Sequence, residues 1–210
     1  MVTPSGNGEK TKVGVLGGTF DPVHNGHLAI AEETRCRLEL DDVIFVPAGK
    51  PWMKAAKPIT PAAHRIAMVR LAISRKPCYR LSTIEVDMAG PSYTVDTLET
   101  LHYEYRGRAE FYFIMGWDNL PELVRWKNPP RIIELACLVA LPRPGSSLPD
   151  LAAIEEKIPG LLKRVIIVEM PLVNISATDI RERVREGLPI GEMVPKEVEW
   201  YIREKGLYRD

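Results

Sequence analysis

The residues richest in chemistry lie between Gly17 and Leu28, where the sequence reads Gly-Gly-Thr-Phe-Asp-Pro-Val-His-Asn-Gly-His-Leu. Gly17 and Gly18 would let the backbone approach a phosphate closely. His24 and His27 can hydrogen-bond or ion-pair with phosphate oxygens, and so stabilise charge that builds on a leaving pyrophosphate. The segment therefore predicts a phosphate-binding site.

Other interpretations of these twelve residues stay open. They are not a Walker A loop, because no Lys-Ser or Lys-Thr pair follows the glycines, and they lack the spacing of the dinucleotide-binding fingerprint. The histidines could bind zinc, although no third ligand is obvious and Cys36 lies more than two helical turns further on. In a purely structural interpretation, Gly17-Gly18 is only a tight turn and Asp21-Pro22 only a turn signal.

A second candidate anion site lies near the C-terminus, where residues 175–181 read Ile-Ser-Ala-Thr-Asp-Ile-Arg. Ser176 and Asp179 fit a helix capping box, and Arg181 could be an ordinary solvated side chain. A helix start that carries Ser176, Thr178 and an arginine one turn in is also a compact anion site. Two such sites in one chain suggest a polyphosphate held from both ends.

Short apolar segments alternate with helix-like segments along the chain. This alternation predicts an α/β fold, a Rossmann-like open parallel sheet with helices on both faces. The first motif would then bridge a strand end and a helix start, where unpaired main-chain N–H groups and the helix dipole favour an anion. The expected strands are Val13–Leu16, Val43–Val46, Phe111–Met115, Ala136–Leu141 and Val165–Val168, and the expected helices are Leu28–Leu40, Pro61–Ser74, Val95–Tyr105, Leu151–Glu156, Thr178–Glu186 and Pro195–Glu204.

The chain is long enough for one sizeable core. We expect residues 1–12 to be a flexible leader and residues 13–210 to be a single domain, with a small C-terminal helical part over about 174–210. The segment 47–61, rich in proline and lysine, predicts a loop over the site.

Composition restricts the partners and the compartment. The 28 Lys and Arg equal the 28 Asp and Glu, so the chain lacks the positive field of a nonspecific nucleic-acid binder. No apolar run approaches the length of a membrane span. The three cysteines, Cys36, Cys78 and Cys137, have no metal or redox spacing and fit packing residues in a reducing cytoplasm. We therefore expect a cytoplasmic protein that binds neither nucleic acid nor membrane.

The motifs at residues 17–28 and 175–181, here called the first and the second motif, together resemble the nucleotidylyltransferases of the HxGH type. Among these, the resemblance is to the bacterial nicotinate-nucleotide adenylyltransferases. The resemblance runs from about Lys12 to the C-terminus. The segments that carry it between and beyond the two motifs are Pro47–Lys54, Pro91–Leu98, Phe113–Asp118, Trp126, Arg143–Gly145 and Gly206–Tyr208.

The resemblance implies a reaction. The phosphate of nicotinate mononucleotide attacks the α-phosphate of ATP, which gives deamido-NAD and pyrophosphate, with magnesium (Mg2+) accompanying ATP and no covalent enzyme intermediate. Catalysis of this kind is positioning plus charge neutralisation, so it needs cations and N–H donors around the triphosphate.

The resemblance also implies residue roles. His24, His27 and Arg181 form the catalytic set, and no residue is assigned as a metal ligand. Thr94 and Trp126 lie on the nicotinate side, with the indole stacking on the ring. The implied ATP-binding residues are Gly17, Gly18, Thr19, Phe20, Lys54, Asp118, Ser176 and Thr178, with Asp118 on the nucleoside ribose.

The middle residues also have structural interpretations. Trp126 could belong to the core, and Thr94 could cap the helix that follows it. Lys54 could be a solvated lysine on a loop. We assign His64 and His102 to structure.

Two positions depart from the usual family pattern. Pro51-Trp52-Met53-Lys54 stands where many members carry Pro-Pro-His-Lys, so the loop histidine is missing. Trp117 stands where a small residue is usual, and it would either press on the nucleoside site or turn outward.

Several alternatives remain at this point. Phosphopantetheine adenylyltransferases share both end motifs, and a preference for nicotinamide mononucleotide would rest on a few N–H donors. A noncatalytic nucleotide sensor is the alternative from another class. A homo-oligomer is possible.

Overall fold

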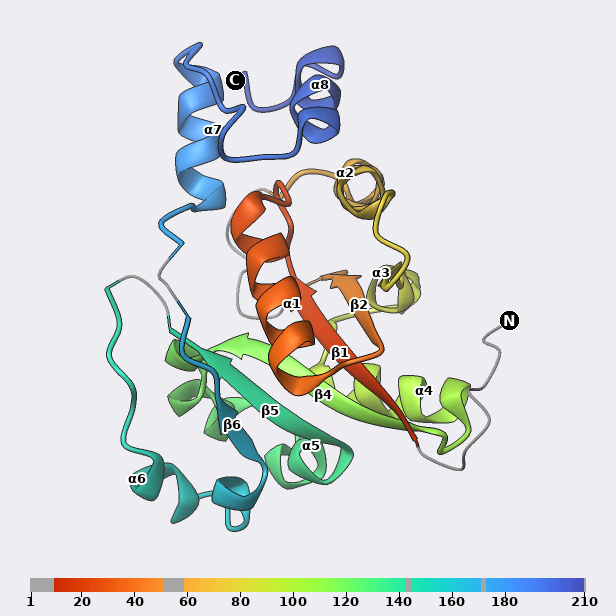
Figure 1. The fold of residues 1–210 in the computed structure, drawn as a ribbon, viewed down its shortest axis with the longest axis vertical. Coiled ribbons are helices and arrows are strands. Elements are labelled where there is room, and N and C mark those ends of the chain that lie inside the picture. The colour runs from red at the N-terminus through yellow and green to blue at the C-terminus, as the bar shows by residue number, and fades with distance from the viewer. Residues whose placement is uncertain (1–9, 51–58, 143–144, 171–172, 210) are drawn as a thin grey trace.

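The fold is a six-stranded, all-parallel open sheet in a computed structural model that describes residues 10–50, 59–142, 145–170 and 173–209 (Figure 1). Its strand order is β3-β2-β1-β4-β5-β6. The predicted α/β class and the open parallel sheet are confirmed. The strands are β1 (Thr11–Gly18), β2 (Asp42–Pro47), β3 (Tyr79–Leu81), β4 (Ala109–Gly116), β5 (Ala136–Leu141) and β6 (Val165–Ile167).

The order of the strands fixes where a ligand can bind. The chain runs outward from β1 to β3 and then returns to place β4 on the other side of β1, with Leu16 opposite Ile114. Loops that follow β1 and β4 therefore leave the sheet in opposite directions, and the crevice between them is where open α/β sheets bind ligands. The first motif follows β1 directly.

Helices cover both faces of the sheet. They are α1 (Asn25–Leu38), α2 (Ala62–Ile73), α3 (Ile84–Asp87), α4 (Thr94–Tyr105), α5 (Pro129–Leu135), α6 (Leu151–Glu155), α7 (Ala177–Arg185) and α8 (Lys196–Glu204), with 3-10 turns η2 (Trp117–Asn119), η3 (Pro121–Arg125) and η4 (Leu161–Lys163). No helix of the described residues is long and apolar enough to cross a membrane.

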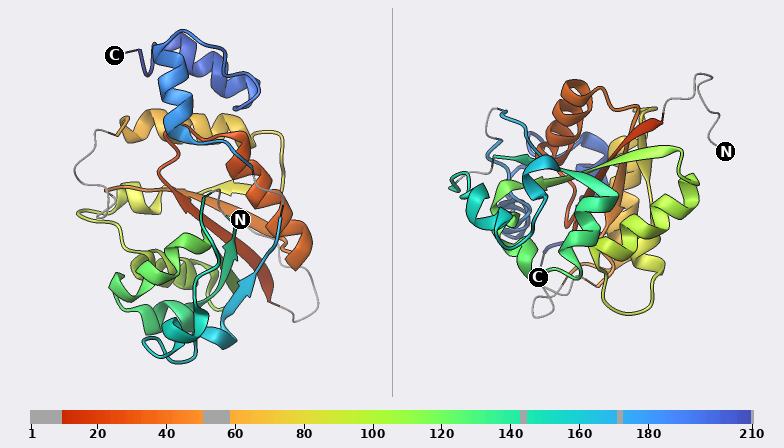
Figure 2. Two further views of the ribbon diagram at one scale, coloured as in Figure 1. Left: turned by 90° about the vertical axis from the view of Figure 1, so that its left-hand side faces the viewer. Right: turned by 90° about the horizontal axis from the view of Figure 1, so that it is seen from below.

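Side chains of the central strands alternate between two apolar clusters, as the period of a strand requires. Val13 and Val15 of β1 join the cluster formed with α4, α5 and α6. Leu16 of β1 and Phe45 of β2 join the cluster formed with α1, α2, α7 and α8. The C-terminal helices α7 and α8 join this second cluster and lie at one end of the molecule, next to α2 (Figure 2, left).

All five expected strands exist, and the differences are local. β1 begins at Thr11, inside the expected leader, because the Thr11 amide donates to the Arg108 carbonyl at 2.9 Å. Residues 1–9 lie outside the described residues. β3 and α5 were not expected, because β3 has Arg80 between Tyr79 and Leu81 and α5 opens on Pro129-Pro130.

Candidate active site

The first motif forms the turn from β1 into α1, and its histidines cap the helix. α1 begins at Asn25, three residues before the predicted start, with His24 in the N-cap position. The His24 amide donates to Nδ1 of His27 at 3.2 Å, and the two imidazole rings stack with centroids 3.7 Å apart. Since Nδ1 of His27 accepts this bond, its ring proton lies on Nε2. His27 therefore offers an N–H donor at Nε2.

The main-chain amides at this helix start are more engaged than the sequence suggested. The Asn25 amide donates to the Met193 carbonyl at 2.8 Å, and the His27 amide donates to the His24 carbonyl at 2.9 Å. The expectation that unpaired amides here bind the phosphate is therefore wrong for these two. These two amides are therefore not available to an anion at the start of α1.

Gly26 and Gly17 of the motif differ in how much room a side chain would have. A Cβ at Gly26 would lie 3.0 Å from Nδ1 of His24, so a side chain there would displace the imidazole. A Cβ at Gly17 would meet nothing nearer than the Phe113 ring at 3.7 Å, and Gly17 is exposed at the end of β1. Packing therefore restricts position 26 but not position 17, and the close approach of a ligand to Gly17 stays a prediction.

The second motif meets the first in space although 160 residues separate them. Ser176 is the N-cap of α7, and its Oγ accepts from the Asp179 amide at 3.1 Å, as predicted. Nη1 of Arg181 donates to the Asp21 carbonyl at 2.7 Å, and Nη2 donates to Oγ1 of Thr178 at 3.4 Å. In Figure 1, β1 points toward the end of the molecule that carries α7. The two predicted anion sites therefore form one region.

Trp126 is partly buried and packs against the first apolar cluster, the one formed with α4, α5 and α6. Its indole meets Phe113 edge to face, with centroids 6.1 Å apart, and Nε1 is buried without a hydrogen-bond partner among the described residues. Phe113 is also the nearest side chain to Gly17. Phe113 thus connects the phosphate motif with the tryptophan implied for the nicotinate side. Core packing of Trp126 is a fact of the structure, and base stacking stays a prediction.

The remaining predicted residues surround the same strand ends. Asp118 lies in η2 directly after β4, and Thr94 is the first residue of α4. The alternative role of Thr94 as helix cap is wrong, because Tyr93 occupies the N-cap position. Trp117 packs against the first cluster, and its Nε1 donates to Oγ of Ser146 at 2.7 Å.

The remaining predictions concern the loop with Lys54, the zinc interpretation and the two other histidines. Lys54, with Trp52 and Met53, lies outside the described residues. The zinc interpretation gains no support, since no three His, Cys, Asp or Glu come together in the part of the chain that the structure describes. His64 bonds Tyr201 through Nδ1 at 3.0 Å and His102 bonds the Leu135 carbonyl through Nε2 at 2.7 Å, so both are structural.

Gly49 and Glu85 were not predicted from the sequence. The Glu85 carbonyl would lie 2.0 Å from a Cβ at position 49, so only glycine fits there. Burial raises the pKa of the Glu85 carboxyl, and hydrogen bonds from Thr97 and the Gly49 backbone oppose this rise. This contact ties the segment after β2 to α3 and α4. The only sequence signal was the glycine itself, in Pro-Ala-Gly-Lys.

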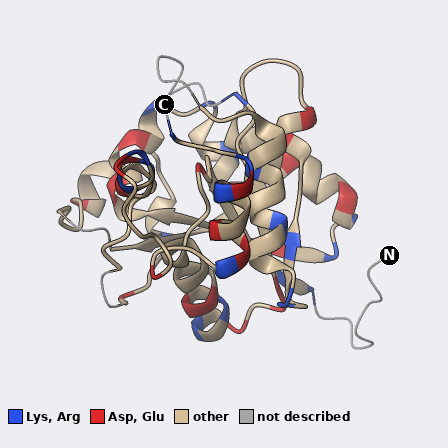
Figure 3. Ribbon diagram, turned by 90° about the horizontal axis from the view of Figure 1, so that it is seen from above, with Lys and Arg blue, Asp and Glu red and all other residues tan. Residues whose placement is uncertain are grey.

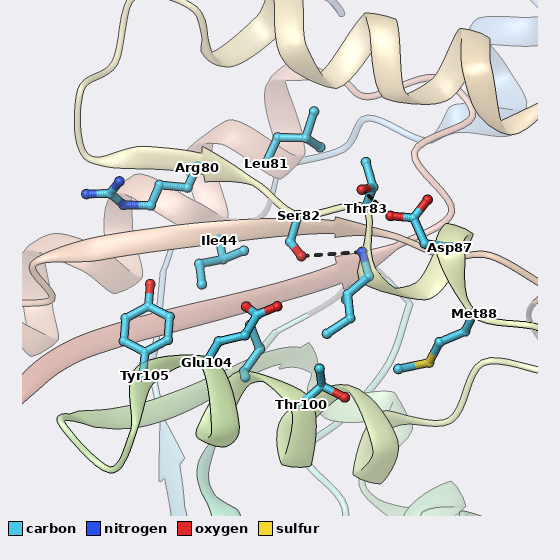
Figure 4. A pocket seen from close by; sticks show the side chains of 12 residues that line it. Ile44, Arg80, Leu81, Ser82, Thr83, Asp87, Met88, Thr100, Glu104 and Tyr105 are labelled. Atoms are coloured by element: carbon cyan, nitrogen blue, oxygen red, sulfur yellow. Dashed lines mark hydrogen bonds between the residues drawn. The ribbon is translucent and has the colours of Figure 1, made fainter. Parts of the chain in front are cut away.

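Two surface hollows lie away from these residues. One of about 590 Å³ lies between β3, α3 and α4, lined by residues such as Arg80, Asp87 and Tyr105 (Figure 4). Another of about 510 Å³ lies between α7 and α8. Neither is lined by a predicted site residue. Residue chemistry at the ends of β1 and β4, and not hollow size, therefore identifies the candidate site.

Comparison with known proteins agrees with this geometry. The family model described as cytidylyltransferase-like matches residues 15–183, a range that includes both motifs. The chain therefore belongs to the cytidylyltransferase-like family, and within it to the nicotinate-nucleotide adenylyltransferases that the following relatives represent.

A probable nicotinate-nucleotide adenylyltransferase from Dehalococcoides mccartyi is 49% identical over 197 residues, which cover 94% of this chain and 97% of that protein. One from Roseiflexus sp. is 48% identical over 94% of this chain and 98% of its own length.

Solved structures with the same fold are more distant in sequence. Plasmodium falciparum nicotinic acid mononucleotide adenylyltransferase, complexed with NaAD, superposes with a TM-score of 0.75 at 18% identity over 94% of this chain and 97% of that one. A putative nicotinate-nucleotide adenylyltransferase from Vibrio parahaemolyticus gives a TM-score of 0.65 at 19% identity over 95% and 96% of the two chains. At these identities the likeness concerns the fold.

Proposed function

We propose that this chain transfers the adenylyl group of ATP to nicotinate mononucleotide, forming deamido-NAD and pyrophosphate. The observation that carries the proposal is the meeting of the two motifs, in which Arg181 from α7 contacts the Asp21 carbonyl next to the stacked His24 and His27. A triphosphate in this region would have cationic or N–H donors on two sides. The nicotinate-nucleotide adenylyltransferases at 48–49% identity support the choice of acceptor.

In the proposed reaction, a phosphate oxygen of the mononucleotide attacks the α-phosphorus of ATP. The new P–O bond forms as the bond from the α-phosphorus to the bridging oxygen breaks, and the electron pair leaves with pyrophosphate. Negative charge then grows on the leaving group, and Nε2–H of His27 and the guanidinium of Arg181 would stabilise it. Catalysis needs no enzyme nucleophile, since positioning and charge neutralisation suffice.

We propose that magnesium arrives with ATP as part of the substrate. The described residues supply no group of three potential metal ligands, so the phosphate oxygens would provide most of its coordination.

The other assignments extend the same proposal. Gly17, Gly18, Thr19 and Phe20 would line the phosphates, with Ser176 and Thr178 opposite them, and Lys54 would reach them from its loop. Asp118 would hold the ribose of the nucleoside, while Thr94 and Trp126 would contact the nicotinate nucleotide. Localisation in the cytoplasm and a possible homo-oligomer stay predictions.

The deciding experiment follows pyrophosphate release from ATP and Mg2+ with purified protein and three separate acceptors. These are nicotinate mononucleotide, nicotinamide mononucleotide and phosphopantetheine. We expect fastest turnover with nicotinate mononucleotide. Turnover with phosphopantetheine alone would contradict the proposal, and ATP binding without release for any acceptor would favour a nucleotide sensor.

A further inference from the structure

Asp21 lies inside the phosphate motif, yet it is 6% exposed and all three of its oxygens face the protein. Oδ1 accepts from the Tyr208 hydroxyl at 2.7 Å, and Oδ2 accepts from the Thr60 amide at 3.1 Å. Its carbonyl accepts from Nη1 of Arg181 at 2.7 Å. Three segments far apart in sequence therefore converge on one residue next to the catalytic histidines.

Arg65 of α2 holds the same turn from a second side. It is 2% exposed, its Nη1 donates to the Thr19 carbonyl at 2.8 Å, and its Nε donates to the Thr60 carbonyl at 2.9 Å. Burial lowers the pKa of Arg65, and the charge of Asp21 opposes that change. A buried guanidinium is costly unless it is hydrogen-bonded, and here two carbonyl oxygens accept from Arg65 while the charge of Asp21 favours the charged form.

Residues near the C-terminus also bond Asn25, which lies between the two histidines. The Asn25 amide donates to the Met193 carbonyl at 2.8 Å, and Nδ2 of Asn25 donates to the Glu192 carbonyl at 2.9 Å. The turn that carries His24 and His27 is therefore fixed before these residues, at Thr19 and Asp21, and between them, at Asn25.

We propose that Asp21, Arg65 and Tyr208 are positioning residues for adenylyl transfer. They fix the main chain at Thr19–Asp21 and, through the Asp21 carbonyl, the guanidinium of Arg181. The donors of both motifs then keep the positions from which they can contact the same triphosphate. The inference rests on the proposed function. The physical reason is that misplacing a catalytic group by about 1 Å costs about 10²-fold in rate.

The sharpest test is Tyr208→Phe, which removes one hydroxyl and keeps the ring. Burial raises the pKa of the Tyr208 phenol, so the group is protonated and donates at neutral pH. We expect kcat to fall about tenfold and KM for ATP to rise, while KM for the mononucleotide stays unchanged, since a smaller displacement costs less than the full 10²-fold. Tyr103→Phe is the matched control, because Tyr103 of α4 is 84% exposed and distant from the motif in sequence.

A double-mutant cycle tests whether Tyr208 acts through Asp21. If it does, adding Tyr208→Phe to Asp21→Asn should cost much less than it does in the wild type. Arg65→Lys should not restore the activity lost in Arg65→Met, because an ammonium cannot reproduce two donors in the fixed directions of a guanidinium.

The outcomes separate this inference from the proposed function. Calorimetric titration with a nonhydrolysable ATP analogue measures the positioning effect without an acceptor, so weaker binding by Tyr208→Phe supports the inference even if no deamido-NAD forms. An unchanged kcat and ATP affinity in folded Tyr208→Phe would overturn it. Equal losses toward ATP and the mononucleotide, matched by a lower melting temperature, would also overturn it, since general destabilisation would then explain them.

Discussion

At the residue scale, the site depends on which nitrogen of His27 carries a proton. The His24 amide occupies Nδ1 of His27, so Nε2 is the atom that can donate to a phosphate oxygen. His24 is 7% exposed, and His27 is more accessible. His24 therefore occupies the helix cap, and we expect His27 to be the histidine that contacts the ligand.

This arrangement predicts the effect of His27→Ala. Turnover should fall by about 10²-fold or more, as for the loss of a positioned donor to a developing charge. Steady-state assay of pyrophosphate release checks the prediction. His64→Gln is the control, because His64 bonds Tyr201 between α2 and α8 and should leave turnover close to that of the wild type. An unchanged rate in folded His27→Ala would remove His27 from the mechanism.

Gly14 and Gly17 of β1 should respond to alanine in opposite ways. Gly17→Ala has room, so stability should hold, while KM for ATP should rise about tenfold, or about 1.4 kcal/mol of binding. At Gly14 the new Cβ would lie 3.0 Å from Cδ1 of Leu40 and 3.1 Å from Cδ1 of Ile114, which should cost about 1–3 kcal/mol of unfolding free energy and spare KM.

Urea denaturation and ATP kinetics on both variants decide between these effects. A destabilised Gly17→Ala with normal KM would assign that glycine to packing and not to the ligand.

At the scale of elements, Glu32 ties α1 to the segment before β3. Its carboxylate accepts from Nζ of Lys76 at 2.7 Å, from Nη2 of Arg35 at 2.8 Å and from the Tyr79 hydroxyl at 2.7 Å. These bonds, that of Lys76 first, hold the pKa of Glu32 well below its usual value of 4.5. A lowered folded-state pKa stabilises the protein above the unfolded value, and this contribution is lost as pH falls below it.

Glu32→Gln should therefore lower the unfolding free energy at pH 7, and the difference from wild type should shrink as pH falls below about 4. The side chain is partly exposed, so we expect a loss of no more than about 1 kcal/mol. Denaturation from pH 3 to 7 checks it, with Glu33→Gln as control, because Glu33 pairs with Arg37 on its own helix. A difference independent of pH would contradict this origin.

At the scale of the whole molecule, the C-terminal helices belong to the same apolar core as the sheet. Ile180 of α7 and Ile202 of α8 share a cluster with Val43 and Phe45 of β2. Acidic and basic residues are interspersed over the molecule (Figure 3), in keeping with 28 of each sign. The continuous core supports a single domain, which stays a prediction.

A single domain should unfold in one cooperative transition. Ile202→Ala, at a side chain that is 2% exposed, should lower the unfolding free energy by about 2–5 kcal/mol and move that transition as a whole. Calorimetry checks it, and Leu188→Ala, at a side chain that is 44% exposed, should change stability by no more than about 0.5 kcal/mol. Two separate transitions would show that α7 and α8 form a lobe of their own.

The sequence by itself determined the class of fold and the two motifs. The alternation of apolar strand segments with helix-like segments predicts the parallel sheet, because each segment type has its own local periodicity. The glycines, histidines and arginine gathered in two short segments predict phosphate binding. β3 and α5 escape this reasoning because Arg80 interrupts the apolar residues of β3, and because α5 opens on two prolines and runs directly into β5.

Only the tertiary structure decided which groups meet. The contact of Arg181 with Asp21, the bond of Tyr208 to the same residue and the pairing of the Asn25 amide with Met193 join segments more than 150 residues apart. Such contacts depend on strand order and on how α7 and α8 pack at the end of the sheet, next to α2, and no local pattern encodes them.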